Sequence, residues 1–90
     1  MVRQKENPSS LQQDGKSTLR VLMLFNDDVN TFDFVIQSLI EVCHHEPEQA
    51  EQCALVAHFK GKCMIKGGGY YELKPYCDEM SLRGLTVSIE

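Results

Sequence analysis

The strongest constraint on the fold is a helical pattern of apolar residues between positions 32 and 43. In the segment FDFVIQSLIEVC, apolar side chains recur at spacings of three and four residues, as on one face of a helix. The next residues, HHEP, end this helix because Pro47 disfavours helical geometry in the residue before it. The residues on the predicted helix face are Phe32, Val35, Ile36, Leu39, Ile40 and Cys43.

Before this helix, the segment LRVLMLF at residues 19–25 is a dense apolar run with the length of a strand. We expect burial on the face that carries Leu19, Val21, Met23 and Phe25. After the helix, Pro47 suits the first position of a second helix, EQAEQCALVAHFK, which Gly61 ends.

The C-terminal third predicts a short strand, KCMIK, and a flexible loop, GGGY, at residues 67–70. A third helix is expected over about residues 71–82, with Pro75 in its early turns and Gly84 beyond its end. The segment LTVSIE, residues 85–90, alternates apolar and polar side chains and predicts a final strand.

The predicted order is strand, helix, helix, strand, helix, strand. This order indicates an α+β fold in which a small three-stranded antiparallel sheet packs against three helices. Residues 1–17 are polar and lack a sustained apolar period, so we expect a flexible N-terminal tail followed by one core domain over residues 18–90.

Size and charge narrow the possible functions. Ninety residues leave little room for a deep enclosed active site, which favours a shallow binding surface. The net charge of −4 argues against a nucleic-acid partner, since phosphate neutralisation needs a basic stripe. No apolar stretch is long enough to span a membrane, and the N-terminus lacks a signal-peptide pattern, so the expected location is cytoplasmic.

The cysteines are expected to be reduced, mostly buried thiols, because the chain lacks an export signal and a CxxC pair. A zinc site built on Cys43, His44 and His45 is not favoured, since adjacent helical residues point in different directions and no second ligand pair completes it. We therefore expect neither metal nor cofactor. The four cysteines are Cys43, Cys53, Cys63 and Cys77.

The segment FNDDVNT, between the first strand and the first helix, is more polar than a turn requires. Asn30 is the expected N-cap, with Asp33 in the third helical position of a capping box. Asp27 and Asp28 then lie upstream of the cap. They either form Asx-turns or recognise a group with several donors and positive charge, such as an ammonium.

Two features of the second helix bear on this choice. Ala54 and Ala57 stand where larger residues would fill the space against the first helix, which leaves room for a foreign side chain. His58 follows on the same face, and a helical hairpin would return it towards the start of the first helix. A lone histidine near a helix C-terminus is more often a dipole-stabilised or core residue than a ligand-binding one.

The string LFNDDVNTFDFVIQSL, followed by ALVAHFKGK, resembles ClpS, the family of bacterial adaptors that deliver N-degron substrates to a Clp protease. The resemblance covers residues 19–66 well and implies a ClpS-like fold. It implies that the free α-amino group of a substrate is bound by Asn26, Asp27, Asp28 and His58. The implied apolar pocket for the first side chain, of Phe, Leu, Tyr or Trp type, is lined by Phe32, Val35, Ile36, Ala54, Ala57 and Leu85.

The resemblance also implies partners. These are N-degron substrate proteins and a Clp AAA+ unfoldase of the ClpA or ClpC type, with Glu72 and Lys74 as its contact residues and residues 1–17 assisting delivery.

Two alternative functions remain open from the sequence alone. One is a small enzyme that uses Asp27, Asp28 and His58, which lacks a nucleophile–base arrangement. The other is a fold relative with an unrelated protein-binding role, which leaves the matched site residues unexplained. We expect a non-enzymatic adaptor.

Overall fold

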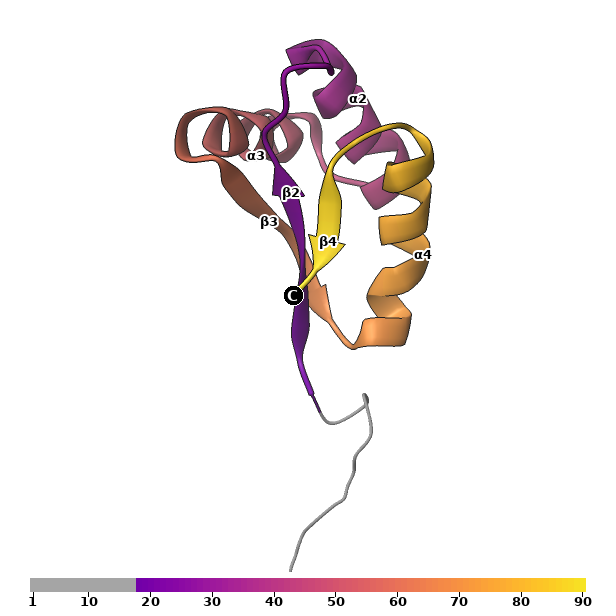
Figure 1. The fold of residues 1–90 in the computed structure, drawn as a ribbon. Helices are drawn as coiled ribbons and strands as arrows, with labels where there is room; N and C mark the ends of the chain where they lie inside the picture. Colours follow the sequence, from indigo (N-terminus) through magenta and orange to yellow (C-terminus); the bar gives the residue numbers. More distant parts are fainter. Residues whose placement is uncertain (1–17) are drawn as a thin grey trace, which may run out of the picture.

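The computed structural model describes residues 18–90, and the expected tail over residues 1–17 lies outside them. The described chain forms strands and helices in the predicted order, so the expected fold class is confirmed (Figure 1). The elements are β2 (Arg20–Phe25), α2 (Phe32–Cys43), α3 (Pro47–Lys60), β3 (Lys62–Gly68), α4 (Tyr70–Leu82) and β4 (Val87–Ile89).

The sheet is antiparallel and has the order β3-β2-β4, so the first strand in the described chain is the central one. Its register against β3 shifts between Leu22 and Met23, where β3 contributes one additional residue, Ile65. At the other edge, Val21 and Glu90 exchange two backbone hydrogen bonds of 2.9 and 2.8 Å, which extend the pairing beyond β4.

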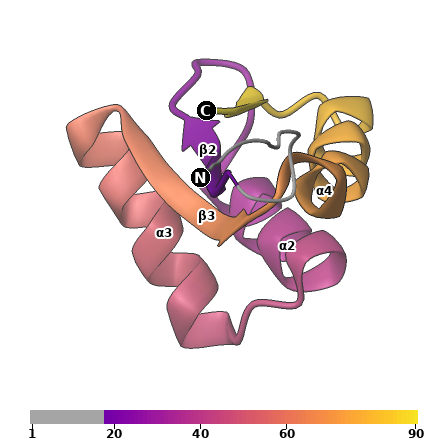
Figure 2. The same ribbon diagram turned by 90° about the horizontal axis from the view of Figure 1, so that it is seen from below.

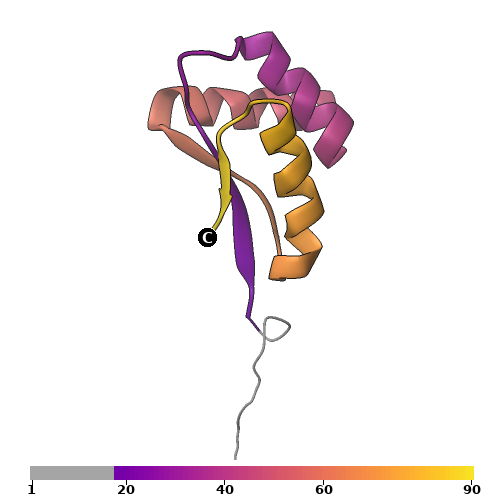
Figure 3. The ribbon, with the colours of Figure 1, turned by 45° about the vertical axis from the view of Figure 1, so that its right-hand side comes forward.

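The helices cover one face of this sheet. Seen from below, α3 lies beside β3 on one side of the molecule and α4 on the other, with α2 between them (Figure 2). A third view shows α4 running alongside β4, whereas α3 lies across the strand direction (Figure 3). This arrangement leaves the connection between β2 and α2 at one end of the sheet, next to the end of α3.

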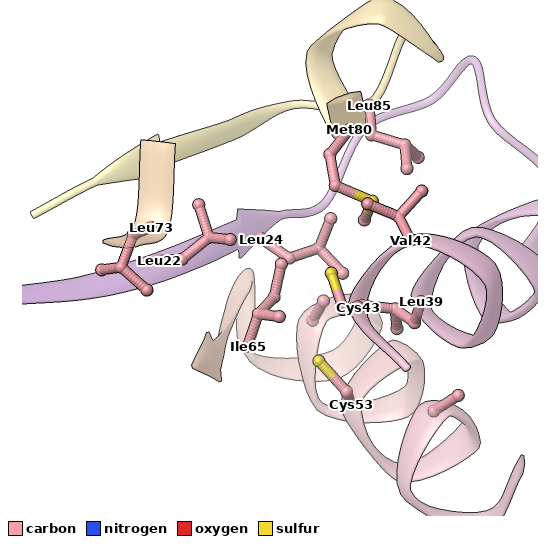
Figure 4. Close-up of a cluster of buried hydrophobic side chains, with 12 residues drawn as sticks. Leu22, Leu24, Leu39, Val42, Cys43, Cys53, Ile65, Leu73, Met80 and Leu85 are labelled. Carbon is pink, nitrogen blue, oxygen red and sulfur yellow. The ribbon is translucent and has the colours of Figure 1, made fainter. Parts of the chain in front are cut away.

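The core fills the space between the sheet and the helices (Figure 4). Leu22 and Leu24 of β2 are buried, whereas the alternate residues Val21 and Met23 are only half-buried. The prediction that Leu19 and its alternates form the buried face is therefore wrong, and Leu19 itself is 84% exposed. The apolar residues 21–25, VLMLF, follow one another without a polar residue, so they carry no alternation from which the buried face can be assigned. The largest fully buried side chains are Leu22, Leu24, Leu39, Leu73, Met80 and Ser38.

The glycine segment is also different from the prediction. Gly67 and Gly68 belong to β3 and pair with Val21 and Arg20, so residues 67–70 are not a loop. The neighbouring strand supplies the pairing that the local sequence alone does not favour. Tyr70 already begins α4, and Pro75 is the sixth residue of that helix, beyond the first turn in which proline costs no hydrogen bond.

Candidate functional site

The connection between β2 and α2, residues 26–31, is organised by the carboxylate of Asp27. Its Oδ1 accepts hydrogen bonds from the backbone N–H groups of Val29 (2.9 Å) and Asn30 (2.8 Å), which is an Asx-turn. Its Oδ2 accepts from the Asn30 side-chain Nδ2 (2.9 Å) and from the Thr86 hydroxyl (3.4 Å). Asp27 is therefore a structural residue of the turn, which agrees with the Asx-turn alternative expected from the sequence.

The helix start is capped one residue later than predicted. Thr31 is the N-cap of α2, and its Oγ1 accepts a hydrogen bond of 3.0 Å from the backbone N–H of Phe34. Asn30 instead directs its side chain away from the helix, donating from Nδ2 both to Asp27 and to the carbonyl oxygen of Gly84 (3.0 Å). Asp33 is then the second helical residue, where its charge still favours the helix dipole.

Hydrogen bonding decides the charge state of Asp27. Burial alone would raise the pKa of its carboxyl, but the bonds from Asn30, Val29 and Thr86 together outweigh burial and lower the pKa below its ordinary value of 3.8. The carboxylate is therefore ionised at neutral pH. It places a fixed negative charge at the turn.

The turn is tied to the end of α3 through the backbone. The N–H of Asn26 donates a hydrogen bond of 2.9 Å to the carbonyl of Gly61, the left-handed residue that caps α3. His58 lies in the last turn of the same helix and is exposed, with its ring edge-on to Phe59 at 4.9 Å between centroids. This backbone contact explains how a histidine from α3 reaches the polar turn before α2.

A cavity with a volume of about 310 Å³ opens at this junction. Its polar residues include Asn26, Asp27, Asp28 and His58, the full set expected to bind an amino group. Within residues 18–90, the side chains of Asn26, Asp28 and His58 make no hydrogen bond of their own, unlike that of Asp27. Four of the six expected apolar pocket residues also line the cavity: Phe32, Val35, Ala54 and Ala57.

The other two expected pocket residues lie elsewhere. Leu85 is 4% exposed and belongs to the hydrophobic core, and Ile36 packs against that core. Neither is part of the cavity lining, whereas Leu24, Phe25 and Asn30 are. Leu24 and Phe25 end β2 directly before the polar turn, so the sequence signal for them was their position next to Asn26. The prediction of Asn30 as the N-cap gives no indication that it lines the cavity.

The two walls of the cavity differ in size. Ala54 and Ala57 are each 4% exposed and contribute only methyl groups, while Phe32 contributes an aromatic ring and has 39% of its surface exposed. The space that the sequence predicts between α2 and α3 is thus present. Phe32 does not close it.

The two residues expected to contact an unfoldase lie on α4, and both are exposed. Glu72 is the third residue of the helix, and its Oε1 accepts a hydrogen bond of 3.3 Å from the backbone N–H of Gly69. Lys74 forms an ion pair with Asp78 at 3.2 Å. Glu72 therefore has a capping role in the fold, whereas Lys74 makes only a surface contact of small energetic value.

The cysteines are all free thiols in the described structure. Burial raises the pKa of Cys43 to about 11, and burial together with the neighbouring thiol of Cys63 raises the pKa of Cys53.

Residues 18–90 contain no group of three or more His, Cys, Asp or Glu side chains placed to hold a metal ion. His44 is exposed and His45 is buried against the carbonyl of Cys43, at 3.4 Å from Nδ1, so the two rings have different surroundings. None of the helices in this part of the chain has the length and hydropathy needed to cross a membrane.

A comparison with known proteins assigns the chain to a class of proteins. The family model described as "ATP-dependent Clp protease adaptor protein ClpS" matches residues 16–88, which places the chain among the adaptor proteins of an energy-dependent protease. The chain belongs to the ClpS family. The resemblance in the sequence is confirmed.

Curated relatives carry the same family name. An ATP-dependent Clp protease adapter protein ClpS of Campylobacter jejuni strain 81-176 is 45% identical over 40 residues, which cover 44% of this chain and 42% of the relative. One of Acetivibrio thermocellus is 38% identical over 50 residues, covering 56% of this chain and 50% of the relative. The matched stretches thus span half the length, or less, of these curated relatives.

A solved structure shares the fold. It is described as "The structure of Agrobacterium tumefaciens ClpS2 bound to L-phenylalaninamide" and superposes with a TM-score of 0.68, covering 80% of this chain and 94% of the other. Its sequence identity is 23%, so this likeness concerns the fold.

Proposed function

We propose that this protein binds the free N-terminal residue of substrate proteins and delivers them to a Clp AAA+ unfoldase for degradation. The observation that carries the proposal is the cavity of about 310 Å³, in which an acidic and amide rim adjoins apolar walls from α2 and α3. This volume lies at the lower end of the roughly 300–1,000 Å³ typical of small-ligand sites. It suits one side chain with its amino group better than an extended peptide.

The polar rim supports selection of a true N-terminus. An α-ammonium has three donors and one positive charge, which match the free acceptors of Asn26, Asp28 and His58 and the negative charge of Asp27, whose own acceptor sites are filled by the turn. An internal amide nitrogen has a single donor and no charge, so it would leave these groups unpaired in the bound state. Among the cavity-lining residues there is neither lysine nor arginine to offset the two carboxylates.

The apolar walls support selection of a bulky hydrophobic first residue. Burial of a Phe or Leu side chain between Phe32 and the methyl groups of Ala54 and Ala57 contributes about 1.5–3 kcal/mol. The solved Agrobacterium tumefaciens relative is described as bound to L-phenylalaninamide, a molecule with a free α-amino group and a phenyl side chain. This description supports the same ligand class for the cavity of this chain.

Direct binding measurements test the proposal. Fluorescence anisotropy would compare peptides that begin with Phe, Leu or Val, labelled at their C-termini, with the same peptides acetylated at the N-terminus. We expect the free Phe and Leu peptides to bind, and acetylation to weaken them roughly 10- to 150-fold, the equivalent of leaving charged hydrogen-bonding groups unpaired. Equal affinities for free and acetylated peptides would refute the role and favour an unrelated protein-binding function.

A further inference from the structure

The hydrogen bonds of Asp27 fall into two groups with different origins. Oδ1 is held by backbone N–H groups of the same turn, those of Val29 and Asn30, and any residue except proline at those positions would supply them. Oδ2 is held only by side chains, namely the amide of Asn30 and the hydroxyl of Thr86. Because Oδ1 is held by the backbone of the turn, the position of Oδ2, and with it the orientation of the carboxylate plane, depends on these two side chains.

The same two side chains connect the turn to a distant part of the chain. Asn30 Nδ2 also donates to the carbonyl of Gly84, a residue 54 positions away, and Thr86 is 59 positions from Asp27. Thr86 is itself fixed, because its carbonyl accepts a backbone hydrogen bond of 2.8 Å from Phe25. The segment between α4 and β4 is thus hydrogen-bonded both to the end of β2 and to the turn that carries the acceptors.

These contacts also occupy the acceptor sites of Asp27. An ionised carboxylate has about four lone-pair sites, and the folded chain already fills four of them. Asn26 and Asp28, the two neighbours of Asp27 in the chain, line the cavity and keep their side chains free within the described residues. Because Asn26 and Asp28 are bonded directly to Asp27, the hydrogen bonds that hold Asp27 also restrain the backbone from which both neighbours present their acceptors.

We propose that Asn30 and Thr86 are positioning residues for the amino-group site, which fix the Asp27 carboxylate and its two neighbours against the segment between α4 and β4. This inference rests on the proposed function. Asn30 has the larger effect, since its single amide group bridges Asp27 and Gly84 at 2.9 and 3.0 Å, whereas the Thr86 contact is 3.4 Å long.

The test measures affinity for a free Phe-initiated peptide and its acetylated form in the full chain and in two variants, Asn30→Ala and Thr86→Val. We expect Asn30→Ala to weaken the free peptide about tenfold, as for loss of one hydrogen bond to a charged group, and Thr86→Val to weaken it about threefold. The acetylated peptide should change by less than about twofold, so that the ratio of the two affinities falls. The matched control is Gln37→Ala, which removes an amide-to-carboxylate hydrogen bond of 3.0 Å to Glu41 on the outside of α2.

A second readout separates positioning from general loosening of the fold. The carboxyl carbon signal of Asp27 can be followed by NMR as the pH is lowered, and its midpoint should rise in both variants, because each removes a hydrogen bond that favours the charged form. The titratable groups that face Asp27 from the cavity are Asp28 of the same turn and His58 of α3. At the α4–β4 segment, Arg83 is engaged by Glu41 at 2.8 Å.

The outcomes decide separately on the two proposals. If the wild-type chain does not distinguish free from acetylated peptides, the proposed function fails and the positioning role fails with it. If the wild type discriminates but both folded variants keep its affinity and the midpoint of Asp27, only the positioning role is overturned. Should Asn30→Ala fail to fold, Thr86→Val decides, because it removes a single hydroxyl from an exposed residue.

Discussion

The Asp27 carboxylate serves the fold as well as the proposed site. The pH dependence of the free energy of unfolding measures its contribution to the fold. Its folded pKa lies below the ordinary value of 3.8, so the stabilisation is complete above that pH and is lost as the pH falls through the lower folded value. We expect Asp27→Asn to be less stable than wild type at pH 7, with a smaller difference at pH 2. Urea unfolding at both pH values measures this. A difference that stays constant would contradict the assignment of the stabilisation to the ionised form.

The cap of α2 is a second residue-scale prediction. Thr31→Ala removes the side-chain acceptor for the N–H of Phe34 and should lower the free energy of unfolding by about 1 kcal/mol. Denaturant unfolding followed by circular dichroism provides the measurement. Ser81→Ala, near the exposed end of α4, removes a hydroxyl that caps no helix start and should cost less. If both substitutions cost the same, Thr31 is not the cap.

The alanines of α3 give a residue-scale test of the pocket. Ala54→Leu fills the cavity and should weaken a Phe-initiated peptide at least about tenfold, because it occupies the volume needed for the ligand's apolar side chain. Its stability should stay within about 1 kcal/mol of wild type. The matched control is Ala50→Leu, at a fully buried core position of the same helix, which should destabilise by about 1–3 kcal/mol through overpacking. Tight binding by a folded Ala54→Leu variant would exclude this cavity as the side-chain pocket.

At the scale of elements, the sequence determines the bounds of the helices more completely than it determines the buried face of a strand or the contacts of a turn. The bounds of α2 follow directly from its apolar period, and Pro47 and Gly61 mark α3 correctly. The buried face of β2 could not be assigned because LRVLMLF lacks alternation. The role of Asn30 was equally out of reach, since its partner Gly84 is brought to it only by the complete fold.

The glycines of β3 and of the α4–β4 segment lead to opposite predictions. Gly67 pairs within the sheet, and a Cβ there would meet only the carbonyl of Arg20 at 3.8 Å, an ordinary contact. Gly67→Ala should therefore stabilise the protein by about 0.4–1 kcal/mol through the unfolded chain. Gly84 has φ +87°, so Gly84→Ala should destabilise it although no atom stands in the way. Thermal unfolding of the two variants compares them, and a shift in the same direction would contradict this account.

At the scale of the whole molecule, the proposed function needs two separate surfaces. The cavity lies between the ends of β2 and α3 and the start of α2, whereas Lys74 is on α4. Lys74→Glu should leave peptide affinity unchanged, because it loses only an exposed ion pair, but should reduce delivery of a Phe-initiated substrate to the Clp protease. Degradation assays with the unfoldase and peptidase, run beside anisotropy, test the separation.

The control for that experiment is Glu51→Lys, a charge reversal on the exposed side of α3. Because the two reversals shift the net charge in opposite directions, equal loss of delivery in both variants would point to a non-specific effect of charge reversal on the surface. Full delivery by Lys74→Glu would remove Lys74 from the unfoldase contact. Glu72 is a poorer choice for this purpose because its carboxylate also caps α4.

The pairing of Val21 with Glu90 has a practical consequence for handling the protein. The mutual backbone hydrogen bonds bring the last residue beside the start of β2, at the end of the sheet opposite the turn over residues 26–31 (Figure 1). A fluorophore or a surface anchor attached at Glu90 would therefore point away from the cavity mouth.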